Sequence, residues 1–289
     1  MNLYRFSLLG AALAAITACS DDTAPKVVTP GPAGLVRFIN AVPDTGAQDF
    51  RFTDAVEGVP NVEFVNLPFR GGTDRGYQRV SAGSHHIRVF MSGSNTSGGF
   101  ANDPTVVSTV MGDIDFTFVD GVHYTFLWNG ASRAKAQNFT IFTDNFTAPA
   151  TGQFTLRALN ANTSAANFYV ASGTAAATTV TGTPTFANVA PNTATGWTGF
   201  AVASSTGNYT VTATPAGATT PVWSAVCPAG AAAAAEVPGV SGALQATAGC
   251  RIASSVFTSI LFPASVAGSK AATFAAPGVV FLIDKQPWQ

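Results

Sequence analysis

The sequence predicts an all-β protein with two similar domains in tandem, and three observations lead to this prediction. Hydrophobic residues make up 47% of the chain and charged residues only 10%, a composition that suits strands and turns better than solvated helices. Apolar and polar residues alternate over short runs bounded by turn residues, as in half-buried strands. The hexapeptide Val-Arg-Phe-Ile-Asn-Ala at residues 36–41 is echoed by Leu-Arg-Ala-Leu-Asn-Ala at residues 156–161.

Residues 1–18 have the features of a lipoprotein signal peptide. Arg5 supplies the positive end, and the apolar run at residues 6–15 is too short to span a bilayer stably. Residues 16–19, Ile-Thr-Ala-Cys, resemble the lipobox of bacterial lipoproteins, in which the Cys becomes the new N-terminus and carries lipid. We therefore expect lipidation at Cys19. The alternative is an ordinary cleaved signal that happens to contain this Cys.

A flexible tether is expected at residues 19–33, which are polar and Pro-rich with nothing periodic to bury. Ser20, rather than Asp, follows Cys19, and by resemblance to the sorting pattern of two-membrane bacteria this points to the outer membrane. Each buried methylene of an acyl chain contributes about 0.8 kcal/mol, so multiple chains would hold the protein stably. The sequence thus predicts an outer membrane lipoprotein.

The first domain is expected at residues 34–150. Within it, Asp113 and Asp115 share one face of a run whose other face carries Ile114 and Phe116. No window of the mature chain holds an apolar stripe with the 3.6-residue period of a helix. Roughly seven short strands per domain, separated by turn residues, are typical of an immunoglobulin-like antiparallel β-sandwich.

The second domain is expected at residues 151–289, because matches to the first domain continue in the same order along the chain. Their offset grows from 120 between Arg37 and Arg157 to 140 between residues 139–144 and 279–284. A slowly growing offset is what two copies of one domain show after loop insertions in the second.

The largest insertion lies between Trp223 and Phe257 and contains Cys227 and Cys250. These two Cys remain once Cys19 is lipidated, and an exported protein folds in an oxidising compartment, so a disulfide between them is expected. Closing a loop of this size would contribute about 3 kcal/mol. We interpret the segment as a surface loop closed by this disulfide.

Several residues of the first domain together resemble the DUF4397 domain, a bacterial domain of unknown function found in exported and surface proteins. They are the run Leu-Val-Arg-Phe-Ile-Asn-Ala-Val-Pro-Asp at residues 35–44, then residues 49–52, Gly76-Tyr77, Ala82-Gly83 and His123-Tyr124-Thr125. The resemblance implies a sandwich-like fold and a cell-envelope setting, and it brings no catalytic residues. In the second domain Asn167 replaces the expected Asp, so its membership depends more on the internal repeat.

Composition and motifs argue against nucleic acid, cofactors and catalysis. The net charge is −1, so no basic field would attract a nucleic acid backbone. Neither a nucleotide-binding glycine motif nor a nucleophile elbow occurs. The chain has three histidines, and the adjacent His85 and His86 face opposite sides of a strand. An enzyme remains an alternative only if His86, His123 and an acid converge in a cleft.

Two sets of side chains are candidates for binding. Tyr77 and Trp197 occupy matching positions, and with Trp223 they could stack on sugars if exposed, although filling the cores is the plainer role of such rings. Asp113 and Asp115 present two carboxylates on one strand face, a candidate calcium site of hard oxygen ligands.

Arg37 and Arg157 are repeated charges on otherwise apolar opening strands. Alternation predicts that Arg37 faces outwards and pairs with an acid such as Asp49 or Asp144, contributing about 0.2–1 kcal/mol. The sequence as a whole predicts a non-catalytic lipid-anchored protein of the cell envelope, acting in binding, adhesion or structural spacing. Its expected partners are the membrane, through the lipid, and an envelope protein or glycan.

Overall fold

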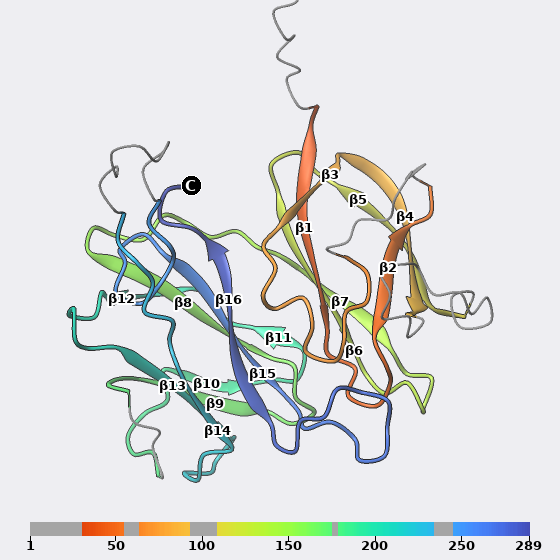
Figure 1. Cartoon of the computed structure of the whole chain (residues 1–289). Helices are drawn as coiled ribbons and strands as arrows, with labels where there is room; N and C mark the ends of the chain where they lie inside the picture. The colour runs from red at the N-terminus through yellow and green to blue at the C-terminus, as the bar shows by residue number, and fades with distance from the viewer. Residues whose placement is uncertain (1–30, 55–63, 93–108, 175–178, 234–244) are drawn as a thin grey trace, which may run out of the picture. The chain divides into compact units, whose positions relative to one another are not determined.

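The computed structural model describes residues 31–54, 64–92, 109–174, 179–233 and 245–289. These residues form sixteen strands and no α-helix, which confirms the all-β prediction (Figure 1). Among them no helix is long and apolar enough to cross a membrane. The predicted signal peptide, the lipidation site Cys19 and the tether as far as residue 30 lie outside the described residues.

The first half of the compact unit, residues 32–150, contains two sheets. Its strands are β1 (Ala33–Asn40), β2 (Gln48–Phe52), β3 (Gln78–Ser81), β4 (Gly83–Met91), β5 (Val110–Phe118), β6 (His123–Asn129) and β7 (Asn138–Thr143). One sheet has the order β3-β1-β6-β7 and the other has the order β2-β4-β5. Strands β1 and β6 pair in parallel, and the other neighbours are antiparallel.

An apolar core lies between these two sheets. Alternate residues of β1, Val36 and Phe38, point into it and meet Phe50 of β2, Ile87 of β4 and Phe126 of β6. The Phe38 and Phe50 rings stack with their centroids 4.9 Å apart. Burying large aromatic side chains of this kind supplies most of the energy that holds two sheets together.

Gly112, which lies against this core, allows the packing to be tested by a substitution. A Cβ added at Gly112 would meet the indole of Trp128, with Cζ3 at 2.8 Å, and this ring is only 1% exposed. Gly112→Ala should therefore lower the free energy of unfolding by about 1–3 kcal/mol in urea denaturation. Gly196→Ala is the control, because nothing lies within 4 Å of its added Cβ. Equal effects at the two glycines would contradict the packing described.

The second half, residues 151–289, also contains two sheets. Its strands are β8 (Gln153–Asn160), β9 (Ala166–Ser172), β10 (Phe186–Val189), β11 (Thr193–Ala194), β12 (Thr198–Ala201), β13 (Tyr209–Pro215), β14 (Trp223–Val226), β15 (Val256–Phe262) and β16 (Gly278–Lys285). The sheet orders are β11-β8-β15-β16, with β12 also pairing with β8, and β10-β9-β13-β14. Strands β8 and β15 pair in parallel, as β1 and β6 do in the first half.

Residues matched in the sequence also make matching hydrogen bonds. Asn40, at the end of β1, donates from Nδ2 to the carbonyl of Leu67 at 2.9 Å, and Asn160, at the end of β8, donates to that of Val189 at 2.9 Å. The amide of the residue after each Asn bonds to the neighbouring parallel strand, at 2.7 Å in the first half and 2.8 Å in the second. The repeated Asn therefore fixes the same turn in both halves.

Asn167 of the second half stands where the first half has Asp49, and the structure shows why either residue is accepted there. Asp49 accepts the backbone N–H of Asn66 at 2.8 Å, and Asn167 accepts that of Asn188 at 2.7 Å. Both accepting side chains use an Oδ1 atom, so an amide can replace a carboxylate here. Asn66 and Asn188 have positive φ angles, 54° and 51°, a conformation that Asn adopts more readily than most residues.

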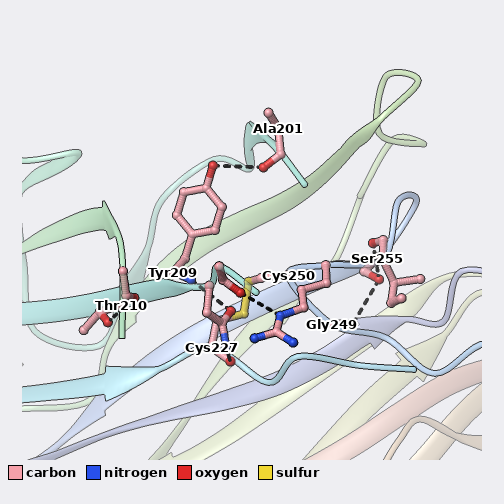
Figure 2. Close-up of a disulfide and its surroundings, with 12 residues drawn as sticks. Ala201, Tyr209, Thr210, Cys227, Gly249, Cys250 and Ser255 are labelled. Atoms are coloured by element: carbon pink, nitrogen blue, oxygen red, sulfur yellow. Dashed lines mark hydrogen bonds between the residues drawn. A yellow bond between two sulfur atoms is a disulfide. The ribbon is translucent and has the colours of Figure 1, made fainter. Parts of the chain in front are cut away.

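Cys227 and Cys250 form the predicted disulfide, with a sequence separation of 23 (Figure 2). The two cysteines are 2% and 1% exposed and belong to the core of the second half, so the prediction of a surface loop is wrong at both ends of the segment. The reason is that β14 pairs with β13 as far as Val226, which carries Cys227 into the core. Residues 234–244 lie outside the described residues.

Hydrogen bonds anchor the surroundings of the disulfide. Figure 2 shows the Tyr209 hydroxyl donating to the carbonyl of Ala201 at 2.9 Å, and the amide of Gly249 donating to Oγ of Ser255 at 3.1 Å. The backbone N–H of Cys250 also bonds to the carbonyl of Pro228 at 2.8 Å. The backbone around the bridge is thus tied to two neighbouring segments.

A third apolar cluster contains residues from both halves. Ile39 of β1 and Leu127 of β6 pack with Leu159 of β8, Ile260 of β15 and Leu282 of β16. The central strands of both halves are therefore buried on both faces, namely β1, β6, β8 and β15. This burial explains why their sequences are nearly continuous apolar runs. Residues 32–289 form one compact unit.

Candidate functional site

A buried polar cluster lies beside this shared apolar layer, and Arg37 of β1 is one of its two centres. The side chain is 1% exposed. Its Nε donates to Oγ1 of Thr125 at 2.9 Å, and its Nη2 donates to Oδ1 of Asp284 at 2.5 Å. Thr125 belongs to the same half as Arg37, whereas Asp284 belongs to the other half.

Arg157 of β8 is the second centre and makes the reciprocal contacts. It is 2% exposed. Its Nε donates to Oγ1 of Thr258 at 2.7 Å, within the second half, and its Nη2 donates to Oδ1 of Asp144 at 2.5 Å, across to the first half. The two halves therefore exchange ion pairs: each arginine takes its carboxylate from the other half.

These contacts correct the expectation for Arg37. The sequence placed it facing outwards, with Asp49 or Asp144 as its partner, whereas it is buried and pairs with Asp284. Asp144 pairs with Arg157 instead, and Asp49 pairs with Arg51. Alternation was right that Arg37 points away from the core of its own half, but the second half covers that face.

Each buried carboxylate of the cluster accepts several hydrogen bonds. Asp144 accepts from Arg157, from the hydroxyl of Thr125 and from the hydroxyl of Tyr77, the last at 2.8 Å. Asp284 accepts from Arg37, from Thr258 at 2.7 Å and from Nε1 of Trp197 at 3.4 Å. Charges this deeply buried are tolerated when they are both paired and hydrogen bonded.

Tyr77 and Trp197 complete the cluster, because their rings pack over the guanidinium groups of the two arginines. The guanidinium carbon of Arg37 lies 4.4 Å from the centroid of the Tyr77 ring, and that of Arg157 lies 4.0 Å from the Trp197 ring. These distances are typical of cation–π contacts. One face of each ring is therefore occupied by a guanidinium. Trp223, by contrast, is 42% exposed and lies on β14 in a different sheet.

Burial and neighbouring charges shift the pKa values of side chains in the cluster. Burial raises the pKa of the Tyr77 hydroxyl well above 10, and the neighbouring Arg37 only partly offsets this effect. Burial alone would lower the pKa of Arg37, but its interactions with Tyr77, Asp284 and Asp144 outweigh burial and raise it. Tyr77 is therefore neutral and Arg37 charged over the whole physiological pH range.

The structure places the candidate calcium ligands Asp113 and Asp115, and His86, on the sheet β2-β4-β5. Nε2 and Nδ1 of His86 lie 2.7 Å from carboxylate oxygens of Asp113 and Asp115, respectively, and Arg88 donates to Asp113 at 2.9 Å. Both candidate calcium ligands are thus engaged by side chains of the neighbouring strand. Among the described residues no group of three or more His, Cys, Asp and Glu side chains is arranged to hold a metal ion.

His123 lies apart from His86, on β6 in the other sheet. Its ring meets that of Tyr77 edge to face, with centroids 4.8 Å apart, and that of Phe146 at 4.9 Å. The structure therefore does not bring His86 and His123 together in one cleft.

A pocket of about 610 Å³ opens beside the polar cluster, between the two halves. The first half contributes Leu35, Tyr77 and His123 to its walls, and the second half contributes Ile283 and Asp284. Sequence reasoning singled out Tyr77 and His123 separately but missed the pocket, because its walls come from segments about 160 to 250 residues apart, a separation that no local pattern spans.

The pKa of His123 gives a pH-dependent prediction. Burial lowers this pKa below 6.5, although the Asp144 carboxylate acts in the opposite direction. The unfolded chain then binds the proton more tightly than the folded chain, so stability should fall as pH drops from about 6.5 through the folded-state pKa.

His123→Gln should remove this part of the acid sensitivity. Urea unfolding at pH 7.5 and pH 5 would show a smaller difference in the variant than in the unmodified chain. The histidines His85 and His86 stay in both proteins, which makes the comparison specific. An unchanged difference would mean that His123 titrates normally.

Part of the chain matches a known family. Residues 34–171 match the family described as "Domain of unknown function (DUF4397)", in agreement with the resemblance seen in the sequence. The matched residues run from β1 through β9 and therefore include Arg37, Asp144 and Arg157. No curated protein matches the chain.

Proposed function

Because a DUF4397 domain occupies residues 34–171, we propose that the chain is a non-catalytic, lipid-anchored protein of the cell envelope that serves as a rigid binding, adhesion or spacing module. It consists of two tandem immunoglobulin-like β-sandwich domains with a common origin, held as one body. The lipid at Cys19 anchors this body to the outer membrane, and a protein or glycan of the envelope is its partner.

The tandem arrangement is supported by agreement between the halves. Each has one sheet with a central parallel pair, β1 with β6 and β8 with β15, and a second sheet packed over it. The repeated Asn residues make the same hydrogen bonds in both. Two unrelated domains would have no reason to share these details.

The observation that carries the proposal is the reciprocal exchange of ion pairs between Arg37 and Asp284 and between Arg157 and Asp144. Domains that move freely meet through small, polar and hydrated surfaces, whereas these charges are buried against an apolar layer. The strongly perturbed groups, Arg37 and Tyr77, lie in this cluster and act on one another. Their perturbation therefore has a structural cause, which favours a scaffold over an enzyme.

The envelope location is supported by two features. The lipobox-like residues 16–19 and the preceding apolar run suit export and lipidation. The Cys227–Cys250 disulfide suits an oxidising compartment outside the cytoplasm.

Expression of the full chain in a two-membrane bacterium tests the anchoring. The protein should incorporate radiolabelled palmitate and fractionate with the outer membrane, and Cys19→Ala should lose both properties. A Cys227→Ala variant is the matched control and should keep the label. A soluble, unlabelled wild-type protein would overturn the proposed anchor.

A binding screen tests the module itself. The chain from Thr23 to Gln289, which contains the whole compact unit, would be applied to envelope extracts and to a glycan array. Saturable binding to an envelope component is expected. Hydrolysis of a bound component would contradict a non-catalytic role, and glycan binding that Trp223→Ala abolishes would make the protein a carbohydrate-binding module.

A further inference from the structure

The junction between the halves follows the pairing rule of a symmetric dimer. In a dimer with a two-fold axis, a residue i of one copy contacts a residue j of the other, and j of the first copy contacts i of the second. Arg37 of the first half pairs with Asp284 of the second. The matching arginine, Arg157, pairs with Asp144, which matches Asp284. The junction therefore has the form of a dimer whose two copies are joined in one chain.

The groups around the ion pairs are repeated in the same way. The hydroxyl of Thr125 donates to Asp144 within the first half, and that of Thr258 donates within the second half at 2.7 Å. Four positions of the shared apolar cluster are also filled from both halves, at equivalent places in the strand registers: Ile39 and Leu159, Ala41 and Ala161, Leu127 and Ile260, and Phe142 and Leu282. Each half thus presents the same cation, carboxylate and apolar patch that it meets on the other.

Arg70 of the first half makes contacts across the junction that depart from this symmetry. Its Nη2 donates to two carbonyls of residues 263–277, the connection between β15 and β16, at 2.6 Å and 2.7 Å. Its guanidinium carbon lies 4.0 Å from the centroid of the Phe274 ring in the same connection. The equivalent connection of the first half, between β6 and β7, is shorter and comprises residues 130–137.

Asn192 takes the place of Arg70 in the second half. Both residues have a positive φ angle, 65° at Arg70 and 54° at Asn192. The amide of Arg70 donates to the carbonyl of Asn40 at 2.7 Å. The amide of Asn192 donates to the carbonyl of the matching Asn160 at 2.6 Å. Because the side chain of Asn is shorter than that of Arg and uncharged, the contacts of Arg70 favour the pairing of unlike halves over like halves.

We propose that the surface buried at the junction is self-complementary, so that each half binds a second copy of the same half when it is released from its neighbour. In a pair of first halves, Arg37 of each copy binds Asp144 of the other. In a pair of second halves, Arg157 of each copy binds Asp284 of the other. Arg70 and the connection that it contacts select the unlike pair found within the chain. The partner that this surface fits is therefore another copy of the domain, reached by exchange of halves between two chains.

This inference rests on the common origin of the halves in the proposed function, and it involves neither the lipid anchor nor an envelope ligand. Two preparations of the chain, one with ordinary and one with heavy nitrogen, would carry a protease site after Pro149 and be cut while folded. They would be mixed in urea, raised until pairs of one light and one heavy fragment appear, and returned to buffer. Native mass spectrometry then weighs each pair.

The unlike pair should be the most abundant species, with homodimers of both halves beside it. Unlike pairs that exchange their fragments without forming any homodimer would overturn the inference and leave the union of the halves intact. Fragments that separate on cutting, before urea is added, would instead contradict the proposed single body as well.

Two substitutions show whether the homodimers use the junction surface. Asp144→Asn should reduce the first-half homodimer about a hundredfold, because this pair depends on the carboxylate twice, and should leave the second-half homodimer unchanged. Arg70→Asn should raise the homodimers about tenfold relative to the unlike pair. Arg88→Asn, on β4 and outside the junction, is the control and should change neither ratio. Homodimers unaffected by Asp144→Asn, or ratios unaffected by Arg70→Asn, would overturn the assignment of the surface.

Discussion

Arg37→Met should lower the free energy of unfolding by about 3–5 kcal/mol, because it leaves the Asp284 carboxylate buried without its cation. Asp284 would keep the hydroxyl of Thr258 and the indole N–H of Trp197, which do not neutralise its charge. Met fills the volume of the arginine stem, so the loss reports the charge rather than a cavity. Urea denaturation at neutral pH measures it.

A double-mutant cycle separates the pair from its surroundings. The double variant Arg37→Met with Asp284→Asn should be more stable than Arg37→Met alone, because the uncompensated charge is removed. Arg88→Met is the matched control: both side chains of its pair with Asp113 are exposed, and the pair should be worth less than about 1 kcal/mol. Equal losses for Arg37→Met and Arg88→Met would show that the buried cluster does not hold the halves together.

Removal of the disulfide by the double change Cys227→Ala and Cys250→Ala should cost about 3 kcal/mol. The bridge closes a loop with a sequence separation of 23, which gives roughly this value from chain entropy. Both cysteines also lie in the apolar core of the second half, so the loss should not be smaller than the entropy estimate. The measurement is the urea unfolding midpoint of the variant beside that of the oxidised chain.

Reduction of the unmodified chain is the control for this experiment. The reduced thiols keep the core volume that the alanines lose, so reduction should cost less than the double substitution. If neither treatment moved the unfolding midpoint, the bridge would not restrain the structure.

Much of the local structure could be predicted because its causes are local. Alternation of Asp113 and Asp115 with apolar residues predicted a strand, and these residues lie within β5 (Val110–Phe118). Two cysteines in a chain expected to be exported predicted the disulfide, which the structure confirms. The disulfide's burial was not predicted, because sequence shows that Cys227 follows a strand but not how far that strand continues in its sheet.

The candidate site could be predicted only in part, because alternation shows which face a side chain lies on but not what covers it. Arg37 was correctly assigned to the face away from its own core. Its partner, Asp284, lies 247 residues further along the chain, and no pattern within a strand links the two. The available signal was the order of the residues: Arg37, Thr125 and Asp144 recur in the same order as Arg157, Thr258 and Asp284 in the second half.

The most direct test of the account is to cut the chain between the halves. A protease site inserted after Pro149, between Asp144 and β8, would allow cleavage of the folded protein, followed by size-exclusion chromatography at physiological salt. If the exchanged ion pairs and the shared apolar cluster join the halves, the two fragments will elute together at the size of the uncut chain. Elution as two separate fragments would contradict the central claim that the two halves form one body.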